Sequence, residues 1–491
     1  MKISLTLLAA ALLTVTASAQ TAQPDITIHG TVADKQKNTY VLVPFNVPAG
    51  TERVTLDLTY TGKEDHSTLD LGLRDPERLR GWSGGNKSHV TVGLADATPS
   101  YLPGPIPAGQ WHLVLGVANI RPGKSATYTA HIYLTKANQA GGKESFTDHP
   151  LSTEARWYRG DLHMHTAHSD GSCPSQSGKP VPCPLFLTLQ NAVSHGLDFV
   201  AVTDHNTTTH YNDERELQPY FDHLLLIPGR EMTTYSGHAN VFGTTEPLDF
   251  FLGTPGSPNM NAIFGAAHRL GAIVSINHPG SPTGEICMGC GWSPSGFDMG
   301  LTDIMEAING NNTTAHVAYW HGQLNAGYRI PAIGGSDDHR ALAPPEAHDF
   351  PGNPTTVVYA SELSVPAILT AIRAGHVFID STASRDRLLE VTASSGSQTA
   401  RMGDLISAPA GAPVRIAISV RACEGSVLTF LLDGKPIPTL PQQNIPSAGE
   451  NLHAEWLSDG AQHWLEADVL TPDGKLQLLG NPIYLNWKPI Q

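Results

Sequence analysis

The chain has 491 residues, which at about 150 residues per domain predicts roughly two to four domains. Its 30 Lys and Arg stand against 45 Asp and Glu, which gives a net charge of −15. An acidic chain argues against a nucleic-acid polymer as partner, because affinity for a phosphate backbone comes from Lys and Arg. A hydrophobic content of 40% with 15% charged residues excludes a disordered chain. The 47 Gly and 37 Pro predict many turns and short strands, and the 23 His require a chemical explanation.

The first residues have the composition of a secretory signal peptide. Lys2 precedes an apolar run over residues 3–15, and Ala17-Ser18-Ala19 forms a small-residue cleavage site. The run is too short to span a bilayer comfortably, and no later stretch reaches the roughly 18 apolar residues of a membrane helix. We therefore predict a signal peptide over 1–19 and an exported soluble protein, periplasmic or secreted, with no membrane anchor after cleavage.

The chain has five cysteines. In an oxidising compartment, Cys173 with Cys183 and Cys287 with Cys290 are plausible disulfides. A four-cysteine zinc site made by the same residues stays open as the alternative. Cys423 ends a strand-like run and is expected to be a buried free thiol.

The pattern of apolar residues changes twice along the chain. Short alternating stretches cut by Gly and Pro predict a β-sandwich over 20–135, followed by a polar linker over 136–155. Apolar runs then alternate with helical periodicity over 156–385, which favours a mostly parallel sheet with helices. Strand patterns return over 386–491 and predict a second, Ig-like β-sandwich.

Helix candidates in the middle region each end at a glycine. The periodicity predicts helices over 185–195, 261–270 and 365–374, closed by Gly196, Gly271 and Gly375. Strand-like runs stand at 197–202, 223–227, 272–276, 304–308 and 330–333.

Histidines and carboxylates gather just after these strand-like runs. His163 and His165 close the first strand in a His-x-His pattern, which places both imidazoles on one face because strand side chains alternate. A single such histidine is usually a surface or core residue, but the joint pattern predicts a metal centre at the carboxyl ends of the strands. A set of imidazoles and carboxylates suits Zn, Mn or Fe. The predicted metal ligands are His163, His165, Asp170, His205, Glu231, His238, His278, Asp337 and His339.

Five ordered segments carry a resemblance to a known family. The segments 161–171 (DLHMHTAHSDG), 202–206 (VTDHN), 229–238 (GREMTTYSGH), 277–279 (NHP) and 335–339 (GSDDH) resemble the motifs of the PHP (polymerase and histidinol phosphatase) superfamily. Within it, the exported layout with flanking β-domains resembles the CehA/McbA-type metallohydrolases, a branch that includes carbaryl hydrolase. The flanking regions match in layout only.

The resemblance implies a distorted (β/α)7 barrel that holds two to three divalent metal ions. His163, His165, Glu231 and Asp337 would then hold the first ion. Glu231 would bridge to a second ion completed by His238 and His278. A third would lie among Asp170, His205 and His339, although histidine is common in the family where Asp170 stands.

Paired ions lower the pKa of a bridging water, so the sequence predicts a hydrolase that uses a metal-bridging hydroxide. The residues predicted as catalytic are His163, His165, Glu231, Asp337 and His339. The favoured reaction is phosphoester cleavage of small mono- or diesters. Carbamate or carboxylic ester hydrolysis, as in carbaryl hydrolase, is the alternative, and a non-catalytic metal- or polymer-binding protein is the second.

Three further residues are predicted to contact the substrate. Arg230 and Arg340 adjoin predicted ligands and could bind an anion, although a salt bridge on the rim explains them equally well. His316 lies on a helical stretch that could cover the site. A small-molecule ester is the expected partner, and a homo-oligomer remains open.

Overall fold

The structure is a computed structural model that describes residues 23–136, 145–285, 287–311, 314–343, 350–447 and 449–488. The predicted signal peptide lies outside the described residues. No helix within the described ranges is both long and apolar enough to cross a membrane.

The N-terminal unit consists of two four-stranded antiparallel sheets, in the orders β1-β8-β3-β6 and β2-β7-β4-β5. Alternating side chains of each strand face a shared core, which contains the buried Trp111, Leu113 and Leu115 of β7. This is the sandwich arrangement that the short strands predicted. The strands are β1 (Ile26–Ala33), β2 (Thr39–Val47), β3 (Thr51–Tyr60), β4 (Thr68–Arg74), β5 (Leu79–Gly84), β6 (His89–Gly93), β7 (Gly109–Asn119) and β8 (Ser125–Lys136), with a 3-10 turn at Asp34–Gln36.

The middle unit divides its strands between two sheets. One contains the parallel strands β9 (Arg156–Asp161), β12 (Phe199–Val200) and β13 (Leu225–Leu226) together with β19 (Thr355–Ala360) and β20 (Val377–Asp380). The other has the order β14 (Gly229–Thr234), β15 (Gly237–Phe242), β16 (Ile273–Ile276), β17 (Ile304–Asn309) and β18 (Ala332–Gly335). Two isolated parallel bridges, Met164 to Asp338 and His205 to Glu231, connect the two sheets. Met164, Asp338 and His205 lie just beyond strand ends, and Glu231 lies within β14.

A continuous (β/α)7 barrel is not shown. The described residues contain five α-helices, and β14 pairs with β15 in an antiparallel hairpin. Only residues 235–236 separate these two strands, whereas a parallel crossover needs a dozen or more residues. The resulting fold is multidomain and rich in sheet, with parallel pairing confined to parts of each sheet.

The glycine-terminated helices are confirmed where the sequence placed them. The helices α1 (Leu185–Ser194), α3 (Met260–Arg269) and α5 (Val365–Ala374) are each followed within two residues by a glycine with positive φ. The Ser364 hydroxyl accepts the backbone N–H of Ala367 and caps the start of α5. The other helices are α2 (His210–Leu217) and α4 (Ala315–Asn325), and a 3-10 turn spans Met299–Leu301.

The C-terminal strands continue a sheet of the middle unit. β20 pairs with β30, with Phe378 opposite Gly480, so a twelve-stranded sheet runs from β13 to β26. A four-stranded sheet, β22-β21-β24-β28, covers this extension and encloses an apolar core with it. The strands are β21 (Leu388–Ser395), β22 (Gln398–Arg401), β23 (Leu405–Ile406), β24 (Pro413–Arg421), β25 (Val427–Leu432), β26 (Lys435–Pro436), β27 (Gln443–Asn444), β28 (Gly449–Leu457), β29 (His463–Leu470), β30 (Leu476–Gly480) and β31 (Ile483–Leu485).

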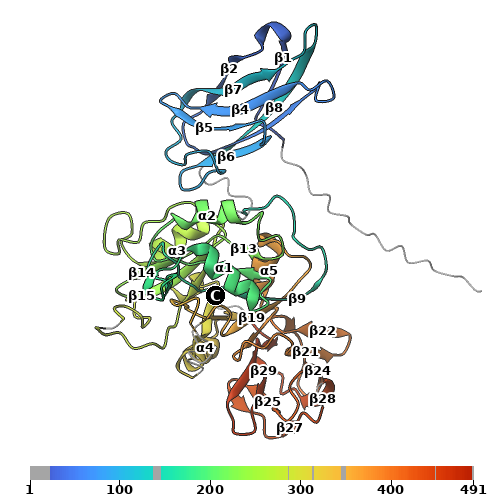
Figure 1. The fold of residues 1–491 in the computed structure, drawn as a ribbon. Helices are drawn as coiled ribbons and strands as arrows, with labels where there is room; N and C mark the ends of the chain where they lie inside the picture. Colours follow the sequence, from blue (N-terminus) through green and yellow to red (C-terminus); the bar gives the residue numbers. More distant parts are fainter. Residues whose placement is uncertain are drawn as a thin grey trace, which may run out of the picture.

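Figure 1 shows the N-terminal sandwich at one end of the molecule and the C-terminal strands at the other, with the middle unit between them. The N-terminal sandwich contacts the middle unit through Asp96, whose buried carboxylate binds Arg53 of β3 and Arg215 of α2. Thr245, just after β15, donates to the same carboxylate at 3.0 Å.

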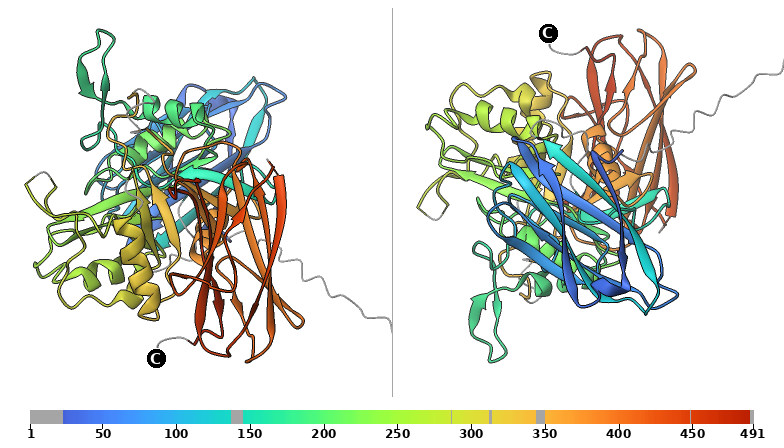
Figure 2. Two further views of the ribbon diagram at one scale, coloured as in Figure 1. Left: turned by 90° about the horizontal axis from the view of Figure 1, so that it is seen from below. Right: turned by 90° about the horizontal axis from the view of Figure 1, so that it is seen from above.

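Both predicted disulfides are present, so the four-cysteine zinc alternative is not the arrangement found. Cys173 pairs with Cys183 and Cys287 pairs with Cys290, while Cys423 is a buried free thiol. The first pair ties together the hairpin of β10 (Ser172–Pro174) and β11 (Pro180–Pro182), which projects from the molecule in both views of Figure 2.

Candidate metal centre

All of the predicted metal ligands come together at one end of the strands of the middle unit. His163 and His165 follow β9, and His205 follows β12. Glu231 and His238 stand on the neighbouring strands β14 and β15. The remaining ligands lie in the loops after β16 and β18 and in the turn before β10.

Glu231 is the centre of this group. Its carboxylate is fully buried, and Oε1 lies 3.3 Å from His163 Nε2, 3.3 Å from His238 Nδ1 and 3.4 Å from His278 Nε2. Its Oε2 lies 2.7 Å from His205 Nδ1. One carboxylate therefore faces imidazoles from four separate segments, as the bridging role implied by the resemblance requires.

Asp337 provides a second carboxylate against the same imidazoles. Its Oδ1 is 3.2 Å from His163 Nε2 and 3.1 Å from His165 Nε2. The backbone of Asp337 has a φ of 54°, and His278 and Asn206 also have positive φ. Such conformations are disfavoured for residues with a side chain and concentrate at functional sites.

A more exposed group lies at the outer edge of the centre. Asp170 Oδ1 is 3.3 Å from His339 Nε2 and 3.6 Å from His205 Nε2, and the Asp170 side chain is 58% exposed. His165, Asp170, His205 and His339 each place one ligand atom within 4.8 Å of the others. This outer group is the part of the centre that solvent and a substrate reach most easily.

Hydrogen bonds behind the imidazoles fix which nitrogen faces the carboxylates. His163 Nδ1 lies 2.6 Å from Glu306 Oε1, which holds the ring with Nε2 directed at Glu231 and Asp337. His278 Nδ1 lies 3.1 Å from the Cys290 carbonyl, and His339 Nδ1 lies 2.8 Å from the Asp337 carbonyl. A carbonyl oxygen only accepts, so the ring nitrogen facing it carries the proton and the opposite nitrogen presents a lone pair.

This arrangement fits metal cations. Lone pairs of neutral imidazoles and of carboxylates repel when they face one another, and a divalent cation between them satisfies both. The buried atoms His163 Nε2 and His165 Nδ1 have no hydrogen-bond partner within the described residues. The groups His163–His165–Asp337 and His163–Glu231–His278 each place their ligand atoms within 4.8 Å of one another.

The pKa values of the carboxylates and imidazoles also show that this site favours positive charge. Burial alone would raise the pKa of Glu231, but the surrounding imidazoles, chiefly His163, hold that pKa well below its usual range. The pKa of Asp337 is likewise held well below its usual range by His163, His165 and His278. Burial opposes charge on His278, yet its hydrogen bond to Glu231 raises its pKa to about 9. Without a metal ion, protons on the imidazoles supply the charge that these carboxylates need.

Glu306 and Asn277 are parts of the site that the sequence interpretation missed. The Asn277 amide donates to Glu231 Oε1 at 2.9 Å, and Glu306 supports His163. A signal for Glu306 existed, because it is a lone carboxylate inside the apolar run 304–308. Asn277 stands directly before a predicted ligand in the NHP motif.

Arg230 does not reach the centre, which corrects its prediction as a substrate contact. Neighbouring strand residues point to opposite faces, so Arg230 turns away when Glu231 turns inward. The guanidinium is buried and donates to the carbonyl of Glu246.

Arg340 lines a separate cavity of about 270 Å³ beside the hairpin, together with Ser172 and Cys173. His316 is buried, and its Nδ1 accepts the backbone N–H of Gly280 at 3.1 Å. Burial lowers the pKa of His316 to about 4, and the charges of Glu306, His278 and Asp337 act on its ring. His316 therefore lies near the centre as a neutral imidazole.

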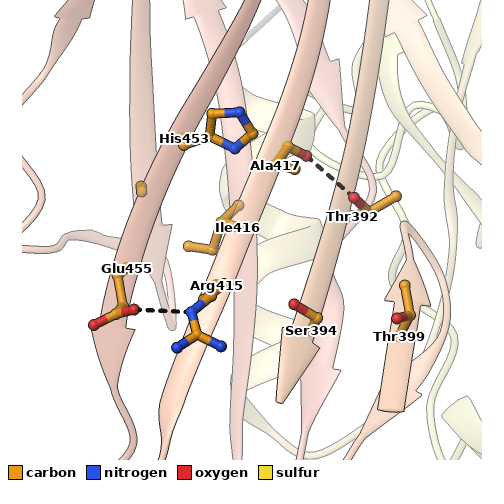
Figure 3. Close-up of a pocket in the computed structure, with 9 residues that line it drawn as sticks. Thr392, Ser394, Thr399, Arg415, Ile416, Ala417, His453 and Glu455 are labelled. Atoms are coloured by element: carbon orange, nitrogen blue, oxygen red, sulfur yellow. Dashed lines mark hydrogen bonds and ion pairs between the residues drawn. The ribbon is translucent and has the colours of Figure 1, made fainter. Parts of the chain in front are cut away.

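Another cavity, of about 600 Å³, lies on the sheet β22-β21-β24-β28 and contains none of the predicted site residues. Figure 3 shows its lining, in which Arg415 pairs with Glu455 at 3.2 Å and the Thr392 hydroxyl donates to the carbonyl of Ala417.

The chain matches no family model and no curated protein. Among solved structures it is similar to a two-domain protein from Bacteroides vulgatus that contains a predicted PHP-like metal-dependent phosphoesterase. The identity is 18%, the match covers 70% of this chain and 98% of that one, and the TM-score is 0.37. A structural similarity this weak does not support an inference about function. We therefore infer the function from the geometry of this chain's own site.

Proposed function

We propose that the protein is an exported, metal-dependent hydrolase of the PHP type, and that it cleaves small phosphate mono- or diesters. One observation carries the proposal: the buried carboxylate of Glu231 faces imidazoles from four segments. Three of these rings, His163, His238 and His278, have outer hydrogen bonds that direct the other nitrogen inward. This set of imidazole and carboxylate donors suits Zn, Mn or Fe.

The ligand sets that the resemblance implies are compatible with the distances. His163, His165, Glu231 and Asp337 would hold one ion. His238 and His278 would hold a second ion with Glu231, and Asp170, His205 and His339 would hold a third. Bound divalent ions supply a nucleophile at neutral pH and stabilise the charge that develops on the substrate oxygens.

The chain's own residues position these groups. Glu306 orients His163, and the Asn277 amide fixes the Glu231 carboxylate. The half-exposed outer group leaves a route for the ester to approach from solvent. His316 carries its proton on Nε2, because Nδ1 accepts the Gly280 N–H, and so offers a neutral N–H donor for a substrate oxygen.

Phosphoester cleavage is favoured over carboxylic or carbamate ester cleavage because several groups of potential metal ligands lie side by side. A phosphoryl group presents several oxygens that carry charge in the transition state, and clustered cations or cationic side chains stabilise them together. An acyl group develops charge on a single oxygen.

A paired rate assay tests the proposal. Protein loaded with Mn²⁺ or Zn²⁺ is given bis-p-nitrophenyl phosphate, p-nitrophenyl phosphate and p-nitrophenyl acetate at equal concentration. A Glu231→Ala variant runs alongside a control, Glu216→Ala, which removes an exposed glutamate on α2.

We expect the phosphate esters to be cleaved faster than the acetate, with the rate lost in Glu231→Ala and kept in Glu216→Ala. Faster acetate cleavage that depends on Glu231 would instead identify the reaction as acyl-ester hydrolysis. Equal rates in both variants for every substrate would contradict a hydrolase whose metal centre is built on Glu231.

A further inference from the structure

The loop after His278 contains the Cys287–Cys290 disulfide and touches two predicted ligands from behind. The Cys290 carbonyl accepts from His278 Nδ1 at 3.1 Å, and the Met288 carbonyl lies 3.4 Å from His238 Nε2. The backbone of this loop therefore helps to hold both imidazoles with their other nitrogen toward Glu231. The redox state of the loop and the geometry of the centre are physically connected.

The sulfur of Cys290 lies near the same imidazoles. His238, His278 and Cys290 each place one potential ligand atom within 4.8 Å of the other two. All three residues are buried, at 5%, 3% and 8% exposed. Two imidazoles and one thiolate form a ligand set that proteins use for zinc.

We propose that His238, His278 and Cys290 form a second, latent metal site that the disulfide keeps closed and that reduction opens. While the disulfide is intact, Cys290 has no thiolate to offer. An external dithiol transfers two electrons and two protons to the disulfide, giving two thiols, and is itself oxidised to a cyclic disulfide. A metal ion that binds then displaces the thiol proton of Cys290.

The latent site competes with the centre around Glu231. His238 and His278 belong to both, and an ion held with Cys290 takes these imidazoles away from the Glu231 carboxylate. A thiolate is a softer ligand than a carboxylate and favours zinc over manganese. Reduction therefore changes which metal the protein prefers as well as where it binds.

Cobalt(II) absorption tests the latent site directly, because a thiolate ligand produces a charge-transfer band in the near ultraviolet. The variant Cys287→Ser leaves Cys290 as a free thiol without any reductant. Cys290→Ser is the matched control, because it leaves the other thiol of the pair free. The buried Cys423 is present in every sample and is corrected for by the oxidised natural chain.

We expect the band in cobalt-loaded Cys287→Ser, and no band in Cys290→Ser or in the oxidised natural chain. Cobalt bound to Cys287→Ser without the band would overturn the proposal. The natural chain, reduced with a dithiol and freed of it under anaerobic conditions, gives the same test without a substitution. The double variant Cys173→Ser/Cys183→Ser, reduced in the same way, should keep the band, because the other disulfide takes no part in the site.

The latent site does not depend on the proposed hydrolase activity, and one further variant separates the two. In Glu231→Ala/Cys287→Ser the band should persist, because Glu231 is not a ligand of the latent site. A band in cobalt-loaded Cys287→Ser together with no hydrolysis by the metal-loaded, oxidised natural chain would contradict the proposed function and leave the latent site standing. Hydrolysis by the oxidised natural chain with cobalt bound to Cys287→Ser but no band would do the reverse.

Discussion

Two pairs of carboxylates in this molecule behave in opposite ways. Glu231 and Asp337 face imidazoles, and their pKa values are held well below the usual range. Glu466 and Asp468, two residues apart on β29, face each other in the C-terminal unit, where burial raises the pKa of Glu466 to about 8 and that of Asp468 well above its usual value.

The difference lies in what surrounds each pair. His321, whose own pKa is lowered by burial, lies 3.0 Å from Glu466 Oε2 and brings no charge that would keep the acid ionised. The Glu466–Asp468 pair therefore lowers its charge by keeping a proton. The Glu231–Asp337 pair is instead kept in its ionised form by the imidazoles that surround it. Burial of acids alone thus does not mark a metal site; the imidazoles around them do.

The largest expected effect comes from removing the central carboxylate. Glu231→Ala should lower both metal content and hydrolysis by more than about 100-fold, beyond the range for residues that only support a ligand. Metal content by mass spectrometry and initial rates measure this. Glu466→Ala, the matched loss of a buried glutamate, should leave the metal content unchanged; an equal loss there would erase the distinction between the two pairs.

Another buried carboxylate, Asp96, differs from both pairs because two arginines of the chain supply its positive charges. Arg53 and Arg215 lower the pKa of Asp96 to about 2 against the effect of burial. Asp96→Asn removes the carboxylate that Arg53 and Arg215 share, although Arg53 keeps Glu246 at 3.7 Å. Breaking a buried ion pair in this way typically costs about 3–5 kcal/mol. In thermal unfolding, the variant's N-terminal sandwich should unfold, or separate from the middle unit, at a lower temperature than in the natural chain.

The sign of the pH effect at Asp96 follows from its low folded pKa. The stabilisation is fully present above the unfolded value near 3.8 and is lost as the pH falls towards 2. An Asp96→Asn chain that unfolded at the same temperature as the natural chain at pH 7 would refute this role.

Glu306→Gln tests the support behind His163. Glutamine keeps the size of the side chain but weakens the hydrogen bond that orients the imidazole. Losses of such partners commonly reduce metal affinity or activity by about 10–100-fold. Competition with a chelator measures the affinity, and Glu285→Gln, at an exposed position, is the control. Unchanged affinity would mean that Glu306 does not orient His163.

The smallest effect is expected from a substitution in the Glu466–Asp468 pair. An acid whose folded pKa is raised stabilises the fold below its unfolded pKa, and this contribution is lost as the pH rises through the folded value. The natural chain should therefore lose stability between about pH 4.5 and pH 8 at Glu466. Glu466→Gln, which resembles the protonated acid, should flatten this part of the Tm profile by a few degrees. A profile identical to that of the natural chain would count against the raised pKa.

The sequence pattern brought the predicted metal ligands together because all of them except Asp170 stand on or just beyond a strand of the middle unit. The helices ended where a glycine could take a positive φ, which is a local property. Glu306 escaped notice because its partner His163 is 143 residues away. The prediction for Arg230 was wrong because the side chains of adjacent strand residues point to opposite faces, so Arg230 points away from the face that Glu231 occupies.

The sheet architecture was less predictable because strand pairing joins residues that are far apart in the sequence. The hairpin β14–β15 and the pairing of β20 with β30 join segments whose local patterns look like separate βα units and a separate sandwich. Strand pairing depends on contacts between distant residues, which local periodicity does not encode.

The most direct test of a metal ion at Glu231 is an anomalous scattering map from crystals of the manganese- or zinc-loaded protein, collected at the edge of the metal. We expect a peak in contact with both Glu231 and Asp337, bordered by the Nε2 atom of His163. A map with metal bound elsewhere and no peak at Glu231 would contradict it.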